Sequence, residues 1–228
     1  MSYRSARSLY NNIANKYHDN RSKATNDVTE LPTVLYLLGD LKNKQLLDMG
    51  CGLGKHAKEF VKRGAIVTGY DTSEKMVKLS QEYCSGKGTF LRATHESVSF
   101  GFNSFDVVNA SYTIGYSNKL DLIFSKVHSW LKPGGIFTFS IPHPLWLLTR
   151  VEKMDYSKPH KVQIKVDSYG IDLFNYYYPL DTYIQVINKN NFLLRNLIES
   201  KISRRLKGWP EEKYRIPNAF VFKVEKSS

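Results

Sequence analysis

The chain has 228 residues, of which 42% are hydrophobic and 24% are charged. This composition is ordinary for a globular protein and does not predict disorder, and the length suits one sizeable hydrophobic core rather than two full domains. The formal net charge of +12 raises the prospect of an anionic partner such as RNA, but the Lys and Arg residues are scattered, which favours a basic, well-solvated surface.

The N-terminal part of the chain predicts two helices. Residues 1–23 carry Tyr10 and Tyr17 at helical spacing with the apolar residues between them, which is typical of a short amphipathic helix. Residues 29–41 predict a second helix, in which Pro32 is tolerated within the first turn.

From residue 45 onward, short apolar strands alternate with helices. The expected strands cover residues 45–49, 65–70, 88–92, 105–110 and 136–141. The expected helices cover residues 55–63, 73–83 and 120–131. Residues 132–135 read KPGG, which predicts a tight turn. This alternation predicts a doubly wound parallel sheet with helices on both faces.

After Pro142 the alternation ends. Residues 142–180 are rich in Tyr and Lys, and we expect them to form a cap insertion at the edge of the sheet. Apolar and polar residues alternate over 162–166, which predicts a strand exposed on one side. The remaining expected elements are a helix over 180–190 and strands over 192–200 and 219–226. No repeat or linker interrupts the chain, so we expect one domain over residues 1–228.

The cysteines and the apolar runs bear on the cellular compartment. Cys51 and Cys84 give neither a disulfide framework nor the spacing of a metal site. The N-terminus lacks the apolar stretch of a signal peptide, and the apolar runs are too short to span a bilayer. We therefore expect a cytoplasmic protein without a membrane segment or a bound metal.

The strongest functional signal is a glycine loop that reads LLDMGCGLG over residues 46–54. Glycine lets the backbone turn sharply and approach a ligand closely. The spacing G-x-G-x-G, followed by Lys55, differs from the G-x-G-x-x-G of dinucleotide-binding domains. Asp48 would repel a phosphate and suits a ligand with a cationic amino group. Asp71 ends the next strand, where a carboxylate can accept both hydroxyls of a ribose, and Thr72 and Ser73 are expected to cap the helix that follows.

These motifs resemble those of class I (Rossmann-like) S-adenosylmethionine-dependent methyltransferases. NSFDVV at residues 103–108 is similar to the strand-four motif of that family, and LKPGGIF at 131–137 is similar to its strand-five motif. The resemblance covers about residues 44–141. It implies a mostly parallel seven-stranded sheet and S-adenosylmethionine as the cofactor.

The flanking residues resemble the ubiquinone-biosynthesis-type branch of small-molecule methyltransferases. YNNIANKYH at residues 10–18 is similar to the aromatic lid helix of that branch, so that Tyr17 and His18 are expected to close over the cofactor. SIPHP at 140–144 is similar to a subgroup in which a Tyr-rich stretch follows strand five.

The resemblance also implies which residues hold the cofactor. Thr94 stands where the family often has an acid for the adenine amino group, so that contact is expected from Thr94, the backbone or Glu96. The residues expected to bind the cofactor are Tyr10, Tyr17, Asp48, Gly50, Cys51, Gly52, Asp71, Thr72, Met76, Thr94, His95, Asn109 and Ala110.

Methyl transfer needs positioning of the acceptor and, for some acceptors, a base. His143 is the candidate base because imidazole titrates near neutral pH, and the alternative is a turn histidine held between two prolines. Tyr116 is a second catalytic candidate. Tyr112 and Trp146 are expected to contact the substrate, with packing as the alternative role.

Three functions are compatible with these motifs. The first is methyl transfer to a small molecule, since the cap could enclose a pocket and its tyrosines suit an aromatic or heterocyclic acceptor. The second is RNA methylation, which the net charge supports, although NASY at residues 109–112 differs from the Asn-Pro-Pro-Tyr motif of amino-group base methylation. The third is a regulatory protein that binds S-adenosylmethionine without turnover.

Overall fold

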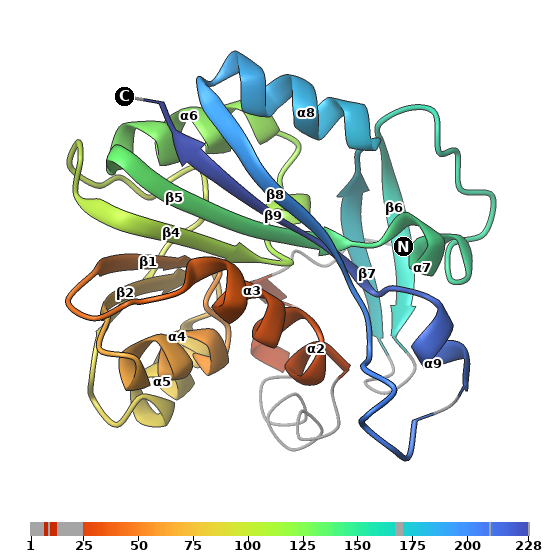
Figure 1. The fold of residues 1–228 in the computed structure, drawn as a ribbon, viewed down its shortest axis with the longest axis horizontal. Helices are drawn as coiled ribbons and strands as arrows, with labels where there is room; N and C mark the ends of the chain where they lie inside the picture. The colour runs from red at the N-terminus through yellow and green to blue at the C-terminus, as the bar shows by residue number, and fades with distance from the viewer. Residues whose placement is uncertain (1–6, 9, 13–24, 167–170, 210, 228) are drawn as a thin grey trace.

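The computed structural model describes residues 7, 8, 10–12, 25–166, 171–209 and 211–227. Within them, seven strands form one sheet in the order β3-β2-β1-β4-β5-β9-β8, and a separate hairpin joins β6 to β7 (Figure 1). The strands β1 to β5 pair in parallel, whereas β9 is antiparallel to both β5 and β8. The expected mostly parallel, seven-stranded sheet is therefore confirmed.

Most elements lie close to their expected bounds. The strands of the main sheet are β1 (Gln45–Met49), β2 (Ile66–Asp71), β3 (Thr89–Arg92), β4 (Phe105–Ser111), β5 (Leu131–Pro142), β8 (Phe192–Ser200) and β9 (Ala219–Lys226). The expected helices are α3 (Glu30–Leu38), α4 (Lys55–Lys62), α5 (Glu74–Tyr83), α6 (Leu120–Trp130) and α8 (Leu180–Lys189). α3 is shorter than expected because the chain leaves the helix at Gly39, which has a φ of 68°. The helix expected within residues 1–23 falls mostly outside the described residues.

The tight turn expected at residues 132–135 is wrong. β5 already begins at Leu131, which pairs with Phe105, and the next paired residue is Ile136, opposite Val107. The residues between them form a bulge in which Gly134 takes a φ of 69°. Pro133 and the glycines after it therefore belong to a bulge inside the strand, not to a turn before it.

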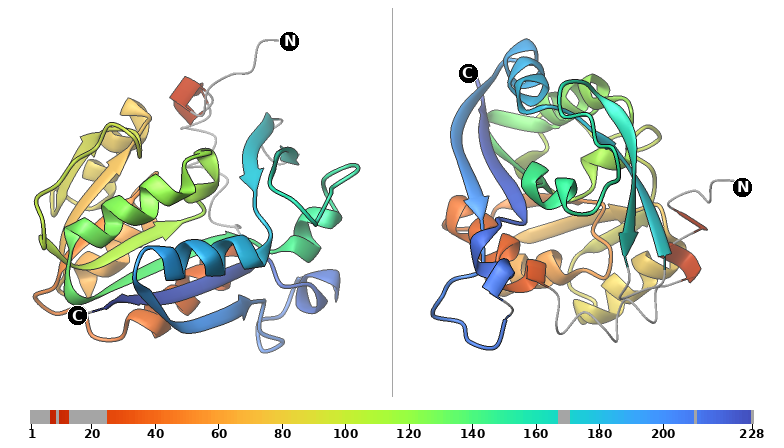
Figure 2. Two further views of the ribbon diagram at one scale, coloured as in Figure 1. Left: turned by 90° about the horizontal axis from the view of Figure 1, so that it is seen from above. Right: turned by 90° about the vertical axis from the view of Figure 1, so that its right-hand side faces the viewer.

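The cap contains more structure than the sequence predicted. The expected strand at 162–166 is β6 (His160–Val166), and it pairs antiparallel with a strand that was not expected, β7 (Ile171–Tyr177). Three short helices were not expected either: α2 (Thr25–Val28), α7 (Pro144–Leu148) and α9 (Glu211–Arg215). The hairpin stands apart from the main sheet in the right-hand panel of Figure 2.

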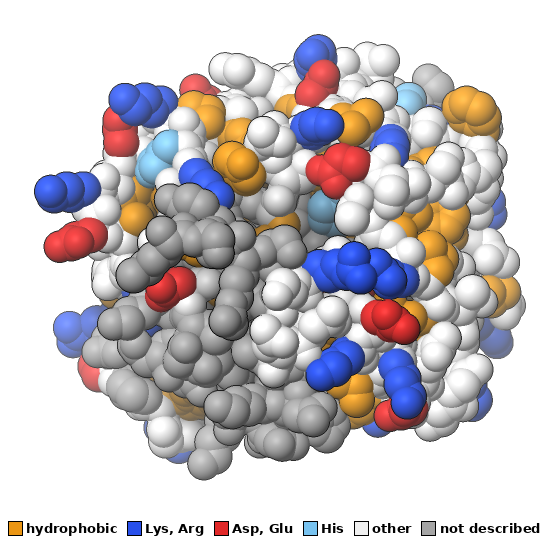
Figure 3. Space-filling model, turned by 180° about the vertical axis from the view of Figure 1, so that it is seen from behind, with side chains coloured by type: hydrophobic (Ala, Val, Ile, Leu, Met, Phe, Trp, Pro, Cys, Tyr) orange, Lys and Arg blue, Asp and Glu red, His pale blue; other side chains and the backbone are white. Residues whose placement is uncertain are grey.

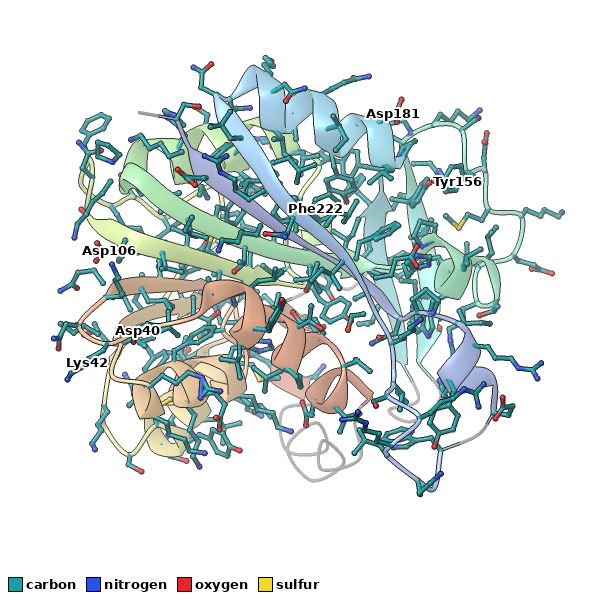
Figure 4. All side chains as sticks on the ribbon, viewed as in Figure 1. Asp40, Lys42, Asp106, Tyr156, Asp181 and Phe222 are labelled. Carbon is teal, nitrogen blue, oxygen red and sulfur yellow. The ribbon has the colours of Figure 1, made fainter. Side chains whose placement is uncertain are left out.

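Two hydrophobic cores cover the two faces of the sheet. On one face, α6 and α8 bury the large aromatic core, in which the rings of Phe139 and Phe222 stack with centroids 4.4 Å apart. On the other face, α3 and α4 pack over a smaller core that includes Val34 and Phe60. Figure 4 shows Phe222 at the centre of the sheet, with Asp106 at the end farthest from the cap. The cap and the glycine loop therefore lie at the opposite end of the sheet, where the parallel strands end.

Candidate active site

The glycine loop leaves the carboxyl end of β1 in a conformation that needs glycine. Gly50, Gly52 and Gly54 have φ values of 62°, 53° and 80°. A Cβ at Gly50 would lie 2.1 Å from Oγ1 of Thr113, whereas a Cβ at Gly52 would have no atom of a described residue within 4 Å. Gly50 is therefore required for packing inside the protein, and Gly52 faces open space that a ligand can occupy.

Asp71 closes this loop from the end of β2. Its carboxylate accepts hydrogen bonds from the backbone N–H of Gly52 at 3.1 Å and of Ser73 at 2.8 Å. Burial raises the pKa of Asp71, although these backbone hydrogen bonds oppose the rise. Ser73 caps α5 as expected, by accepting a hydrogen bond from the N–H of Met76, and no such cap is formed by Thr72. The acid is thus held beside the loop by the loop's own backbone.

Asp48 lies on the buried side of β1. Its Oδ1 accepts a hydrogen bond from Nδ2 of Asn109 at 2.8 Å, while Oδ2 is buried and has no hydrogen-bond partner among the described residues. Burial raises the pKa of Asp48 to about 6, although His56 and Asn109 oppose this effect. Asn109 is itself fully buried, and its Oδ1 accepts from Thr138. Asn109 therefore orients Asp48, and its side chain is fully used inside the sheet.

Two residues that the sequence analysis did not assign extend this polar cluster. Glu30 of α3 is fully buried, accepts a hydrogen bond from Oγ of Ser111 at 2.7 Å and pairs with Nε2 of His56 at 2.8 Å. Burial alone would raise the pKa of Glu30, but His56 and the hydrogen bonds of Ser111 and Ser140 together outweigh burial, so the pKa is lowered. Glu30 shares the buried stripe of α3 with Val34 and Leu37. An acid on an otherwise apolar helical stripe was the signal that could have revealed it.

Part of the expected lid lies over the glycine loop. Tyr10 packs against the buried pair of Leu53 and Met76, and its hydroxyl lies 2.6 Å from that of Tyr116. Oδ1 of Asn11 accepts a hydrogen bond from Oγ of Ser73 at 2.6 Å. Burial raises the pKa of Tyr116, which keeps this phenol protonated at neutral pH. Tyr17 and His18 lie outside the described residues.

The adenine region expected after β3 is already hydrogen-bonded internally. The hydroxyl of Thr94 bonds with Ser97. Nε2 of His95 lies 3.2 Å from the carbonyl oxygen of Thr113, and Nδ1 lies 2.7 Å from the hydroxyl of Tyr70. Because a carbonyl only accepts, Nε2 carries the hydrogen and Nδ1 accepts from Tyr70. Burial lowers the pKa of His95, which is consistent with a neutral ring. This ring holds Thr113, the residue that packs against Gly50, through its hydrogen bond.

A narrow pocket lies between the loop after β4 and the cap hairpin. Tyr112 and Gly115 line it on the side of the glycine loop, and Thr113, which lies between them in the chain, packs against Gly50 of that loop. Tyrosine rings dominate the lining: Tyr112, Tyr176, Tyr177, Tyr178 and Tyr183. Residues of β5, α7 and β6 complete the lining; most of them are aliphatic, and Ser140 is polar. Asn175 of β7 is also part of the lining. Tyr112 thus lies where the substrate was expected, whereas Ala110 is buried in the core of the sheet.

His143 is placed as a structural residue. It is 3% exposed, and its Nδ1 accepts a hydrogen bond from the N–H of Leu145 at 3.2 Å, which caps α7. Nε2 lies 3.4 Å from Glu199, and the ring packs on Phe220 with centroids 4.3 Å apart. Burial lowers the pKa of His143. Since both nitrogens are engaged and His143 does not line the pocket, the geometry supports the alternative role, a fixed turn histidine, rather than a base.

We expect His143→Ala to lower stability without lowering cofactor affinity. Loss of the cap and of the buried ring should cost about 1–2 kcal/mol and lower the Tm by several degrees. His143→Asn is the matched control, because asparagine also caps helices and should recover part of the loss. Thermal denaturation and calorimetry measure the two effects, and a stable His143→Ala protein would contradict the structural role.

Cys51 and Trp146 also take structural positions. Burial raises the pKa of the Cys51 thiol well above its usual range, so the thiol stays protonated in the loop. Trp146 packs in the cap cluster with Leu147, and the guanidinium of Arg150 lies 4.9 Å from its ring centroid. Trp146 therefore flanks the pocket without lining it.

The chain is similar in sequence to one known domain family and to several curated proteins. Residues 47–139 match the methyltransferase domain family. This part of the chain is therefore similar to methyltransferase domains. An uncharacterized protein of Haemophilus influenzae is 35% identical over 128 residues, 53% of this chain and 50% of that protein. A sterol 24-C-methyltransferase of Gibberella zeae is 30% identical over 136 residues, 57% of this chain and 35% of the relative.

A solved structure supports the same class. A protein from Listeria monocytogenes described as an S-adenosylmethionine-dependent methyltransferase is 27% identical, with a TM-score of 0.73, over 87% of this chain and 96% of that one. The expected class I methyltransferase fold and its cofactor, S-adenosylmethionine, are thereby confirmed. The chain matches half or less of the two curated relatives' lengths. The ubiquinone-biosynthesis-type branch stays a prediction.

The residues at the strand ends fit this cofactor. Oδ2 of Asp48 is a buried acceptor without a hydrogen-bond partner among the described residues, which suits a cationic amino group, and Asp71 is a second carboxylate at the next strand end. The open space before Gly52 admits a ligand against the backbone. Among the described residues, no group of three or more His, Cys, Asp or Glu side chains could hold a metal ion. No helix in the described part of the chain is long and apolar enough to cross a bilayer.

Proposed function

We propose that the chain transfers a methyl group from S-adenosylmethionine to a small-molecule acceptor, and that it does so as one domain whose cap, residues 142–180, encloses the acceptor. The observation that carries this proposal is the pocket between residues 112–116 and the cap hairpin. It lies across a single segment from the glycine loop, because Thr113 packs on Gly50 while Tyr112 and Gly115 line the pocket.

The residues of the chain supply binding and positioning. When bound, S-adenosylmethionine supplies a methyl group activated by a sulfonium. We propose that Asp48 pairs with the amino group of the cofactor and that Asp71 accepts the ribose hydroxyls. Tyr10 and Tyr116, joined through their hydroxyls, would cover the site and exclude water.

The distribution of charge favours a small molecule over RNA. On the face shown in Figure 3, Lys and Arg side chains lie among Asp and Glu side chains, and the coloured part of that face carries no continuous basic strip. The described residues that line the pocket include no Lys or Arg. RNA binding normally uses a basic track along the phosphates.

The test is isotope transfer from cofactor carrying a labelled methyl group. We expect the label in the small-molecule fraction of a metabolite extract and not in an equal mass of total RNA. Label in RNA alone would favour the second function. Binding of S-adenosylhomocysteine without any transfer would favour the regulatory protein.

We expect Asp71→Ala to weaken binding of S-adenosylhomocysteine. Loss of charge-assisted hydrogen bonds should cost about 1.5–3 kcal/mol, or about 10- to 100-fold in affinity. Asp106→Ala is the matched control, because Asp106 also accepts a backbone N–H, that of Gln45 at 2.8 Å, but lies far from the cap (Figure 4). Calorimetry that shows equal affinities for both variants would contradict the role of Asp71.

A further inference from the structure

We propose that Asn175 is a recognition residue for the methyl acceptor, and that the acceptor is a neutral aromatic or heteroaromatic molecule that presents an N–H or O–H group to Oδ1 of Asn175. This inference rests on the proposed function, because it identifies the pocket beside the glycine loop as the acceptor site. It adds the polar group by which the protein would select its acceptor.

Asn175 interrupts an apolar row. In β7, Leu173 and Tyr177 alternate with exposed or half-buried residues and join the hydrophobic cluster of the cap. Asn175 lies between them on the same face and pairs in register with Val162, which is buried in that cluster. An apolar side chain would satisfy this position for folding alone, because the inward residues of such a hairpin are ordinarily hydrophobic.

The carboxamide of Asn175 is buried without its full set of partners. The residue is 8% exposed, and its Oδ1 has no hydrogen-bond partner among the described residues. Leaving a buried acceptor unpaired destabilises a protein, so such a group calls for a specific explanation. Gly115 borders the amide without a side chain of its own, since a Cβ there would lie 3.7 Å from Cγ of Asn175. A ligand bound in the pocket would explain both the unpaired oxygen of Asn175 and the aromatic side chains that surround it.

Three of the five tyrosines that line the pocket already use their hydroxyl groups. The hydroxyl of Tyr112 accepts a hydrogen bond from Asn218 at 3.2 Å. The hydroxyl of Tyr178 donates to the carbonyl of Ser117 at 3.3 Å, and that of Tyr177 donates to the carbonyl of Tyr156 at 3.2 Å. Oδ1 of Asn175 is thus an acceptor that the described part of the protein leaves free for a ligand.

The rest of the lining determines the chemical class of the ligand. None of the described residues around the pocket is Asp, Glu, Lys, Arg or His, so a charged ligand would lose its hydration without gaining a counter-ion. The five tyrosines offer flat surfaces against which an aromatic ring packs favourably. A neutral ring with one hydrogen-bond donor satisfies both the tyrosines and the carboxamide.

The experiment uses two matched pairs of probes: indole with 1-methylindole, and 2-naphthol with 2-methoxynaphthalene. Within each pair only one member carries the donor. Their affinities are measured by NMR titration against the full chain saturated with S-adenosylhomocysteine, and against the Asn175→Leu variant. Gln163→Leu is the control, because Gln163 lies on the exposed face of the same hairpin and bonds to Asp172.

We expect the donor-bearing probes to bind the unchanged protein and the Gln163→Leu variant about tenfold more tightly than their methylated partners. In Asn175→Leu this preference should disappear, while affinity for S-adenosylhomocysteine stays the same. The Tm of the ligand-free variant should rise, since the unpaired amide is removed. Equal binding of both members of each pair to the unchanged protein, a preference that persists in Asn175→Leu, or no binding of any probe would each overturn the proposal. Failure of S-adenosylhomocysteine to bind the unchanged protein would instead count against the proposed function.

Discussion

Replacing Gly52 with alanine is expected to abolish measurable cofactor binding while the protein stays folded. The φ of 53° at Gly52 costs an alanine about 1–2 kcal/mol. The new Cβ meets no atom of the described residues within 4 Å, so they give the loop no steric reason to rearrange. The methyl group instead occupies the open space in which we place the cofactor, and affinity should fall by more than about 100-fold.

Two other glycines make this result interpretable. Gly86 has a φ of 69°, and a Cβ there would likewise meet no atom within 4 Å in the described part of the chain, but this glycine lies in an exposed turn after α5. Gly86→Ala should therefore show the same loss of stability with unchanged affinity for S-adenosylhomocysteine. Gly50→Ala should destabilise the fold itself, because its Cβ would collide with Thr113. Calorimetry and thermal denaturation separate the three outcomes, and tight binding by Gly52→Ala would refute the placement of the cofactor.

Cofactor affinity is expected to rise with pH through about 6, and Asp48→Asn should remove this dependence. Burial raises the pKa of Asp48 to about 6, so below that pH the carboxyl group is neutral and offers no counter-charge to the amino group. Above it the carboxylate is ionised and the pair forms. At pH 7.5 we expect Asp48→Asn to bind about 10- to 100-fold more weakly than the unchanged protein.

The same shift predicts the stability of the ligand-free protein. The pKa of Asp48 in the folded protein lies above its ordinary value of 3.8, so folding favours the protonated side chain. The resulting contribution to the free energy of unfolding is fully present below pH 3.8 and is lost as the pH rises through about 6. Asp48→Asn should therefore unfold at a higher denaturant concentration than the unchanged protein at pH 7.5. Asp106→Ala serves as the control, since it retains Asp48, is not among the groups that shift the pKa of Asp48, and should retain the step near pH 6. A step that persists in Asp48→Asn would assign it to another group.

The glycine loop and the sheet could be predicted because their causes are local. The spacing of Gly50, Gly52 and Gly54 reflects backbone angles that few other residues adopt. Apolar strands such as β1 and β4 are recognisable because a strand covered on both faces has no polar side to show. Each of these local requirements produces a recognisable sequence pattern, either a glycine spacing or an apolar run.

The roles of His143 and Asn175 could not be predicted in this way. The imidazole of His143 could serve as a base. In the structure, however, its ring packs against Phe220 and accepts a hydrogen bond from the N–H of Leu145. Asn175 is an ordinary polar residue in the sequence, and only the pairing of β7 with β6 places it on a buried face. Whether a polar side chain is free to act depends on neighbours from distant segments.

The sequence by itself therefore determined the class of the sheet and the position of the glycine loop, because each follows from short-range backbone requirements. Its resemblance to class I methyltransferases supplied the identity of the cofactor. Only the tertiary structure decided which polar groups remain unpaired. It joins Glu30 to His56, engages both nitrogens of His143, and leaves single oxygens of Asp48 and Asn175 without partners among the described residues. The physical reason is that hydrogen-bond satisfaction is settled between residues far apart in the chain, when packing excludes water from them.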